Sequence, residues 1–375
     1  MHHHNHHFWW RFFPHNELSR IYFSTAIRFF AISLISLFVP LYLYKEIGLS
    51  FQNTLYFYIF YSVIFAIMSP VAAKFASKYG IKHSVLISIP FYLIFILLLN
   101  FLSSYQIPLM LLAFFLGSSL AFYWIGMHLI FHNASHKNHR GEEFGKRAAV
   151  SILATLFGPI LGGVLIKFMG FKFLFLLVAI LLFISAIFLF MSKESHPNYH
   201  FSVRSLADRK HWQDSLFFVS RGTRVMANGV IWPLFIFVIL NDYLSLGLVG
   251  SLLAGISAFL IWFMGKHSDH LNKHKIVHLI TGAESFSWFL RSAVTNVSQI
   301  FMVTIFGAIT HGLMEGPVGA LEYDKAKKNA VEYFVSREVF ICLGRILITI
   351  FVLMSDSLSS GLVLHGVANL AALFF

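Results

Sequence analysis

The chain has 375 residues, of which 58% are hydrophobic and 12% are charged, and its formal net charge is +12. Soluble domains carry about 25% charged residues, so this composition excludes an ordinary water-soluble protein. The cations lie in short gaps between long apolar runs, which argues against a nucleic-acid-binding surface. The single cysteine, Cys342, lies inside an apolar run, so a disulfide framework is excluded as well.

Residues 1–16 form a His-rich segment that contains His2 to His7 interrupted by Asn5. Native histidine usage and a purification tag are both compatible with it, so it is left out of the fold prediction. The first apolar run is too long for a secretory signal and lacks a small-residue cleavage site. We therefore expect no cleavable signal peptide.

Hydropathy predicts twelve membrane-spanning helices, because lipid offers no partner for exposed backbone groups. The expected spans of the first half are 17–44, 52–77, 83–101, 107–131, 144–167 and 172–191. Those of the second half are 214–240, 246–265, 275–294, 298–320, 330–354 and 357–374. The predicted fold is an all-α polytopic membrane protein with two pseudo-symmetric six-helix bundles, residues 17–191 and 214–375. The polar segment 192–213 is the predicted linker between them.

The Lys and Arg residues of the predicted gaps are strongly biased to one side. The N-terminus and the even-numbered gaps hold 19 of them, whereas the odd-numbered gaps hold only Lys45, Lys167, Lys172 and Arg291. Cytoplasmic loops carry the excess of Lys and Arg. We therefore expect a multi-pass protein of the cell membrane with both termini and the linker in the cytoplasm.

Two features recur at about half the length of the chain. The segments 73–82 and 265–274 align at an offset of 192 residues. Arg28 precedes Pro40 by twelve residues, and Arg221 precedes Pro233 by the same interval, at an offset of 193. A membrane chain that repeats itself in this way is typical of two related bundles around a central path.

The repeated segments carry a loop motif between two spans. Gly265, Asp269 and Lys273 match a Gly-x-x-x-Asp-(Arg/Lys)-x-Gly-(Arg/Lys)-(Arg/Lys) pattern, and the first copy contains Ser77, Lys78, Gly80 and Lys82. Through this motif, its span count and its repeat, the chain resembles the major facilitator superfamily of secondary transporters. The resemblance implies that the aspartate of the motif helps to hold the two bundles together through its charge. Ser77 occupies that position in the first copy, and because it is uncharged it cannot form this contact. Locally, Gly80 or Asn272 can adopt positive φ, and Ser77 or Asp269 can cap the next helix.

The fifth predicted span contains Gly158, Pro159, Gly162 and Gly163. Proline bends a helix, and glycines allow a neighbouring helix to approach closely. The segment resembles the antiporter signature of the same family, which implies proton-driven export; a kinked packing helix is the alternative. The fourth span lacks the arginine that antiporters carry there.

Ionisable residues inside spans usually face a cavity or a partner, because each costs at least about 2.5 kcal/mol in lipid. Glu315 is expected to pair with Arg337 or Arg345, and Glu315 or Glu284 to hold a proton in one transport state. Arg28 and Arg221, matched by the repeat, can present positive charge to an anionic or zwitterionic solute. The candidates for coupling or gating are Glu315, Arg337 and Glu338. The candidates for lining the substrate path are Arg28, Tyr123, Trp124, His128, Arg221, Arg224, Trp232, Glu284, Trp288 and Arg345.

The predicted function is transport of a small solute by alternating access, with proton-coupled export as one form of it. We expect a monomer in a lipid bilayer with no cofactor, no resident metal and no nucleic-acid partner. A receptor or scaffold and a membrane-embedded enzyme are the alternatives. The spacing of His132, His136 and His139 also admits metal transport, but no cysteine or carboxylate completes that set. The chain has no ATP-binding loop motif.

Overall fold

The computed structural model describes residues 17–134, 140–190, 194–203, 206, 212–268, 272–326 and 329–375. Over these ranges the regular secondary structure is helical throughout. The elements of the first half are α1 (Glu17–Ser36), α2 (Val39–Leu41), η2 (Tyr42–Glu46), α3 (Phe51–Tyr79), α4 (Ile81–Phe101), α5 (Leu109–Ala134) and α6 (Arg140–Phe190).

The elements of the second half follow the residues of the predicted linker. They are α7 (Trp212–Met226), η5 (Ala227–Ile231), α8 (Trp232–Leu240), α9 (Tyr243–Ser268), α10 (Lys273–Ser292), α11 (Val297–Lys325), α12 (Ala330–Ser355), α13 (Leu358–Ala368) and η6 (Asn369–Phe374). The predicted spans and these helices agree to within a few residues at most ends. One difference matters below: α11 extends five residues beyond its predicted end at residue 320.

Within the described ranges, nine helical segments are long and apolar enough to cross a membrane. Three features of the structure explain why this number is smaller than the twelve spans predicted from the sequence. Two predicted spans run together as α6, whose helix is interrupted at Gly170 with φ 78° and ψ 172°. The α10 helix carries four charged residues, which lower its hydropathy. The last segment, Leu358–Phe374, is too short. The chain is nevertheless a multi-pass, all-helical membrane protein.

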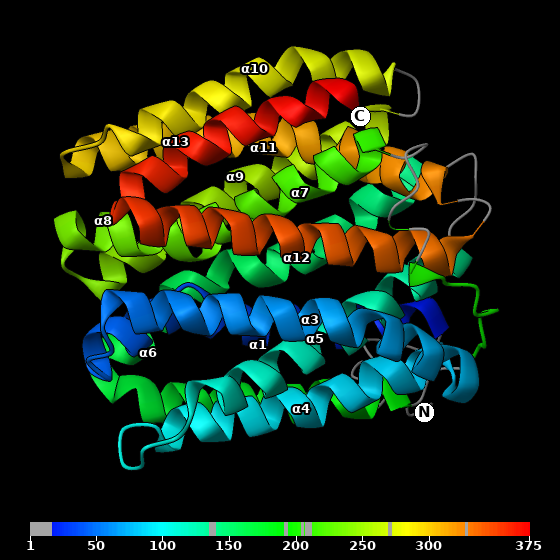
Figure 1. The fold of residues 1–375 in the computed structure, drawn as a ribbon, viewed down its shortest axis with the longest axis horizontal. Helices are drawn as coiled ribbons and strands as arrows, with labels where there is room; N and C mark the ends of the chain where they lie inside the picture. Colours follow the sequence, from blue (N-terminus) through cyan, green and yellow to red (C-terminus); the bar gives the residue numbers. More distant parts are fainter. Residues whose placement is uncertain are drawn as a thin grey trace, which may run out of the picture.

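The helices run along the long axis of the molecule, with α1 to α6 on one side and α7 to α13 on the other (Figure 1). The two halves meet where α3 packs against α12 and α6 packs against α9, a boundary that we call the seam. The right-hand end of Figure 1, where α5 and α11 end and α12 begins, is called the linker end. Both α1 and the C-terminus of the chain reach this end.

The glycine–proline motif of α6 lies against α1 and across the seam from α9. A Cβ on Gly162 would lie 2.2 Å from the Leu34 carbonyl oxygen of α1. One on Gly163 would lie 2.6 Å from the Tyr243 carbonyl oxygen, and one on Gly247 would lie 2.4 Å from that of Pro159. Glycine is required at these positions because the two backbones approach this closely.

The prolines matched by the repeat lie beside irregular helix turns in both halves. Pro40 belongs to α2, which follows a break at residues 37–38 and precedes the π-helical η2. Pro233 is the second residue of α8, which directly follows the π-helical η5. A proline ring crowds the preceding turn and removes a backbone donor, which favours a departure from regular α geometry there.

Candidate functional site: a buried charge ladder

A row of alternating charges runs through the second half of the protein. It is built by α7, α10, α11 and α12 of that half, where α7 packs against α12 and α10 packs against α11. We call it the charge ladder, and its members are Glu284, Arg224, Glu315, Arg221, Glu322, Arg337 and Glu338.

The central part of the ladder is a pair of hydrogen bonds between Arg221 and Glu315. Arg221 Nη1 donates to Glu315 Oε2 at 2.6 Å, and Nη2 donates to Oε1 at 2.5 Å. This bidentate geometry is the strongest form of an arginine–carboxylate pair. Arg224, one helical turn further along α7, lies 3.6 Å from Glu315 and 3.3 Å from Glu284. The i,i+3 spacing of Arg221 and Arg224 places both on one face of α7, from which they reach carboxylates of α10 and α11.

Towards the linker end the ladder continues through Glu322. Its Oε2 accepts a hydrogen bond from Arg337 Nε at 2.9 Å, and its Oε1 lies 4.0 Å from Arg221 Nε. Arg337 also donates to its neighbour Glu338. Each arginine of the ladder therefore has a carboxylate partner, which offsets the cost of taking its charge out of water.

His128 of α5 connects the first half to the linker end of the ladder. Its Nδ1 lies 2.7 Å from the Tyr323 hydroxyl, and its Nε2 lies 3.3 Å from Glu338 and 3.2 Å from Arg337. His128 is buried, and its ring stacks on the Phe334 ring of α12 with 4.8 Å between the ring centres. The two halves are thus joined here by polar contacts through one histidine.

A second set of polar contacts joins the halves at the opposite end of the molecule. Lys45 donates to Asn241 at 3.4 Å, and the Tyr243 hydroxyl donates to Glu46 at 2.6 Å. Nearby, Lys167 lies 3.8 Å from Asp242. Burial alone would raise the pKa of Asp242, but hydrogen bonds from Ser245 and the charge of Lys167 outweigh it and lower that pKa. The halves are therefore in contact at both ends.

The pairing predicted for Glu315 was wrong in its partners. Glu315 binds Arg221 and Arg224, whereas Arg337 binds Glu322 and Glu338. Arg345 forms no ion pair with the carboxylates of the described residues. Sequence spacing places residues on a helix face, but it does not say how neighbouring helices are rotated, and that rotation decides the partners.

Arg291 was also misplaced by the sequence analysis, which counted it among the loop cations. It is buried near the end of α10, donates to the Asn228 side chain at 3.0 Å, and lies 4.1 Å from the Trp288 ring and 5.4 Å from the Trp232 ring. The signal that was missed is the i,i+3 spacing of Trp288 and Arg291, which stacks the cation on the indole. When Arg291 is no longer counted as a loop cation, the odd-numbered gaps hold even fewer Lys and Arg residues, so the charge bias that predicts the orientation becomes stronger.

Two further predicted path residues lie on α5 near His128. Tyr123 packs under the Arg28 guanidinium at 3.9 Å from its ring centre. Trp124 stacks on His128 at 5.6 Å. Both rings thus lie beside charged or polar groups, and the Tyr123 ring is buried.

The loop motif of the first half is closed by a residue of the predicted linker. Gly80 has φ 104° and joins α3 directly to α4, as a tight turn requires. Glu194 accepts hydrogen bonds from the backbone of Lys82 at 2.8 Å and also contacts His83. A carboxylate at a helix N-terminus is stabilising. Glu194 therefore satisfies the first turn of α4, the role expected of Ser77.

In the second half, the corresponding turn is capped by Asn272, whose side chain accepts from the Lys275 backbone at 3.1 Å. Its φ is −73°, so the positive φ considered for Asn272 is not adopted. Lys273 lies 3.7 Å from Asp324, Gly265 belongs to α9, and Lys78 of the first copy lies over the Tyr79 ring. Asp269 lies outside the described residues.

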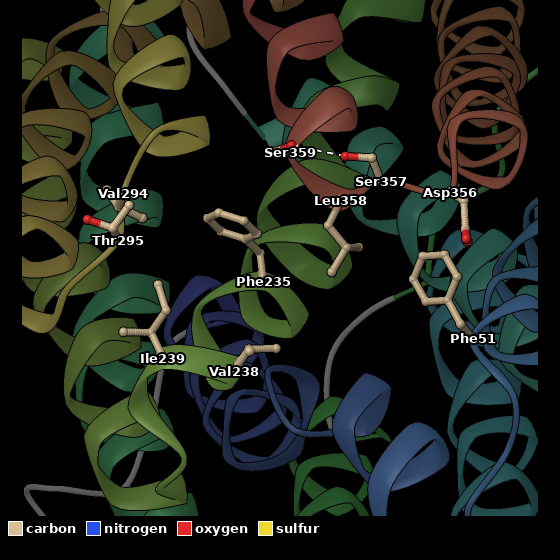
Figure 2. Close-up of a pocket in the computed structure, with 10 residues that line it drawn as sticks. All are labelled: Phe51, Phe235, Val238, Ile239, Val294, Thr295, Asp356, Ser357, Leu358 and Ser359. Atoms are coloured by element: carbon tan, nitrogen blue, oxygen red, sulfur yellow. Dashed lines mark hydrogen bonds between the residues drawn. The ribbon is translucent and has the colours of Figure 1, made fainter.

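A cavity of about 680 Å³ opens at the end opposite to the linker. Figure 2 shows Phe51 of α3 on one side and residues of α8 and of the loops before α11 and α13 on the others. The lining is mostly apolar, with the Asp356 carboxylate at its edge. The cavity is therefore lined mainly by the second half, and Phe51 is the lining residue that comes from the first half.

The described residues contain no group of three His, Cys, Asp or Glu side chains placed to hold a metal ion. Two of the three histidines behind the metal-transport alternative, His136 and His139, lie outside those residues. His132 lies near the Phe334 ring at 6.3 Å.

Comparison with known proteins identifies the protein family to which the chain belongs. The chain is 25% identical over 256 residues to the uncharacterized protein YqgE of Bacillus subtilis (strain 168), which covers 64% of this chain. The match spans 59% of that relative's length, which is less than two thirds. The sequence model of the Major Facilitator Superfamily matches residues 21–349, most of the chain. The protein therefore belongs to the Major Facilitator Superfamily, whose members are generally membrane transporters.

Proposed function

We propose that this protein is a secondary transporter that moves a small solute by alternating access between two six-helix bundles. Residues 17–191 and 214–375 form the bundles, with α6 contributing two spans on either side of Gly170 and with α10 and α13–η6 each crossing the membrane. The interruption of α6 at Gly170 and the repeat offset support this arrangement. The protein is proposed to act as a monomer in the cytoplasmic membrane, with its termini in the cytoplasm.

The observation that carries the proposal is that the charge ladder is paired within one half. Its six arginine–carboxylate contacts among the described residues all connect α7, α10, α11 and α12, and His128 of the first half adds one contact with Glu338. The second bundle can therefore rotate against the first without leaving an arginine or a glutamate of the ladder unpaired in lipid. If the ion pairs of the ladder instead joined the two halves along the whole seam, they would have to break for the halves to rotate, and they would resist the movement.

Two sets of polar contacts between the halves lie near the two ends, where gates would be needed, and one further hydrogen bond, from the Ile160 N–H to the Ser251 hydroxyl at 3.0 Å, joins α6 and α9. Opening at the linker end breaks the His128 contacts with Tyr323 and Glu338. Opening at the other end breaks those of Lys45 and Glu46 with Asn241 and Tyr243, which are exposed and therefore weak. Rocking the bundles opens one set while the other stays closed.

Release of solutes from proteoliposomes tests the proposal across many candidate substrates at once. Vesicles loaded with a small-molecule cell extract are incubated with and without the purified protein in their membrane, and the retained solutes are compared by mass spectrometry. Selective loss of one solute class is expected in the protein-containing vesicles. Equal retention of every solute would exclude transport, leaving the receptor and enzyme alternatives.

Proton coupling is proposed to act through Glu315 rather than Glu284. The Glu315 side chain is 18% exposed and that of Glu284 only 2%, so a proton reaches Glu315 more easily. Protonation would release Arg221 and Arg224 from their shared carboxylate. We predict that Glu315→Gln transport no longer responds to a pH gradient, whereas Glu284→Gln transport still does.

The measurement is solute flux with and without a pH gradient, with Glu332→Gln at the start of α12 as the matched control. Only the ratio of the two fluxes is compared, because lost charge also changes protein stability. If the ratio is unchanged in both ladder variants, neither carboxylate couples protons to transport.

A further inference from the structure

The buried arginines differ in how fully their charges are matched. Arg221, Arg224 and Arg337 belong to the charge ladder and have carboxylate partners. Arg28 and Arg345 are 2% and 6% exposed, yet neither lies within 4.0 Å of a carboxylate among the described residues. Each is therefore a buried positive charge without a carboxylate in ion-pair contact among the described residues, although Glu338 acts electrostatically on Arg345 from a greater distance.

Arg28 and Arg345 also keep unused hydrogen-bond donors. Arg28 Nη1 donates to the Ser88 hydroxyl at 2.9 Å, but its Nε and Nη2 are buried and have no acceptor. Arg345 has two such nitrogens, Nε and Nη1. Arg224 and Arg291 each keep one such nitrogen as well, but Arg224 lies beside two carboxylates and Arg291 donates to the Asn228 side chain. An unsatisfied donor on a charged, buried group is expensive.

The surroundings of both arginines are aromatic. Arg28 lies 3.9 Å from the centre of the Tyr123 ring and 5.9 Å from that of Tyr92. Arg345 of α12 crosses the seam and lies 5.7 Å from the Tyr61 ring and 4.9 Å from the Phe65 ring, both on α3. Ring faces attract a cation but do not neutralise it.

A continuous series of ring contacts connects the two sites. From the Arg28 side, Tyr92 contacts Phe95, which stacks on Phe57 at 6.3 Å. Phe57 contacts Tyr61, which lies beneath Arg345. Arg28 and Arg345, one from each half, therefore contact the two ends of one series of rings on α3 and α4. We call this series, Tyr92, Phe95, Phe57 and Tyr61, the aromatic wall. Both arginines lie near the middle of their own helices.

From this geometry we propose that the transported solute is an amphipathic organic anion. Arg345 and Arg28 supply the positive charge for its carboxylate, sulfonate or phosphate group through their free donors, and the aromatic wall packs against its apolar body. An anionic oxygen group matches the planar fork of arginine. The inference rests on the proposed transport function and specifies its substrate class.

The first test compares probes that share one aromatic body and differ in charge. Thermal unfolding of the detergent-solubilised protein is measured with benzoate, benzenesulfonate, phenyl phosphate, inorganic phosphate, neutral benzamide and cationic benzylamine. One or more of the aromatic anions is expected to raise the melting temperature, and the responsive one identifies the acidic group. Stabilisation by inorganic phosphate alone would mean that the aromatic wall is not used and would overturn the amphipathic assignment. A response to benzamide or benzylamine equal to that of the anions, or no response to any anion, would also overturn it.

The second test separates a binding arginine from a structural one. Arg345→Met and Arg28→Met remove an unmatched buried charge, so each is expected to raise the melting temperature of the ligand-free protein by about 2–4 °C and to abolish the anion response. Arg345→Lys, which keeps the charge but loses the fork, is expected to retain a weakened response. If the methionine variants lower the melting temperature and keep the anion response, the arginines are structural.

The vesicle release experiment distinguishes this inference from the proposed function. Protein-dependent loss of anionic solutes supports both. Loss of neutral or cationic solutes only would leave transport standing and overturn the anionic substrate. Equal retention of every solute would overturn the proposed function itself.

Discussion

Replacing Arg221 with methionine is expected to destabilise the protein by about 3–5 kcal/mol, the range for breaking a buried ion pair by removing one partner. The variant loses both hydrogen bonds to Glu315 and leaves that carboxylate with Arg224 at 3.6 Å and with the His311 ring at 3.8 Å. Unfolding in detergent, by heat or by denaturant, measures the loss. This change is the opposite of that expected for Arg345→Met, although both remove an arginine from a membrane helix.

The matched control is the double variant Arg221→Met, Glu315→Met. It removes both charges of the pair, so the Glu315 carboxylate is not left behind and Glu322 keeps Arg337 as its partner, and it is expected to be more stable than the single variant. A single variant that is as stable as the wild type, or no less stable than the double variant, would show that the charge ladder does not hold the second half together.

Introducing valine at Gly247 is expected to abolish transport and reduce the yield of folded protein. A Cβ at this position would lie 2.4 Å from the Pro159 carbonyl oxygen, which belongs to the backbone of α6 and cannot move aside alone. The seam between α6 and α9 would have to separate, and overpacking of this kind typically costs about 1–3 kcal/mol. Solute release from proteoliposomes and the melting temperature measure the two effects.

Gly282→Val provides the control, because a Cβ on Gly282 meets no atom within 4 Å. Both glycines lie in helices, so the propensity effects of the two substitutions are similar. Equal transport by the two variants would mean that the close approach of α6 and α9 is not needed for function.

The sequence predicted the class of the fold because hydropathy is a local property. Long apolar runs identify helices whatever their neighbours, and the Gly80 turn follows from a backbone conformation that glycine adopts easily. The family expectation is confirmed by the match over residues 21–349. The repeat at half-length indicated two related halves, which remains a prediction.

The candidate site was less accessible to sequence reasoning, because it depends on helix rotation and on the helix ends. Glu322 was overlooked since the predicted span stopped at residue 320, whereas α11 continues to Lys325. His128 was noted as a path residue, but its contacts with Tyr323 and Glu338 depend on how α5 lies against α11 and α12, which are far away in the sequence. Charge in an apolar run indicates a buried site, but does not identify the partner.

Distances across both ends of the seam, measured in the same sample, test alternating access most directly. In a Cys342→Ser background, spin labels at Asn133 of α5 and Ala330 of α12 report on the linker end. Labels at Tyr44 and Val238, both exposed, report on the opposite end. Rocking of two bundles predicts two distance populations at each end that change in opposite directions when pH or solute is varied. A single unchanged distance at both ends, or lengthening of both together, would contradict it.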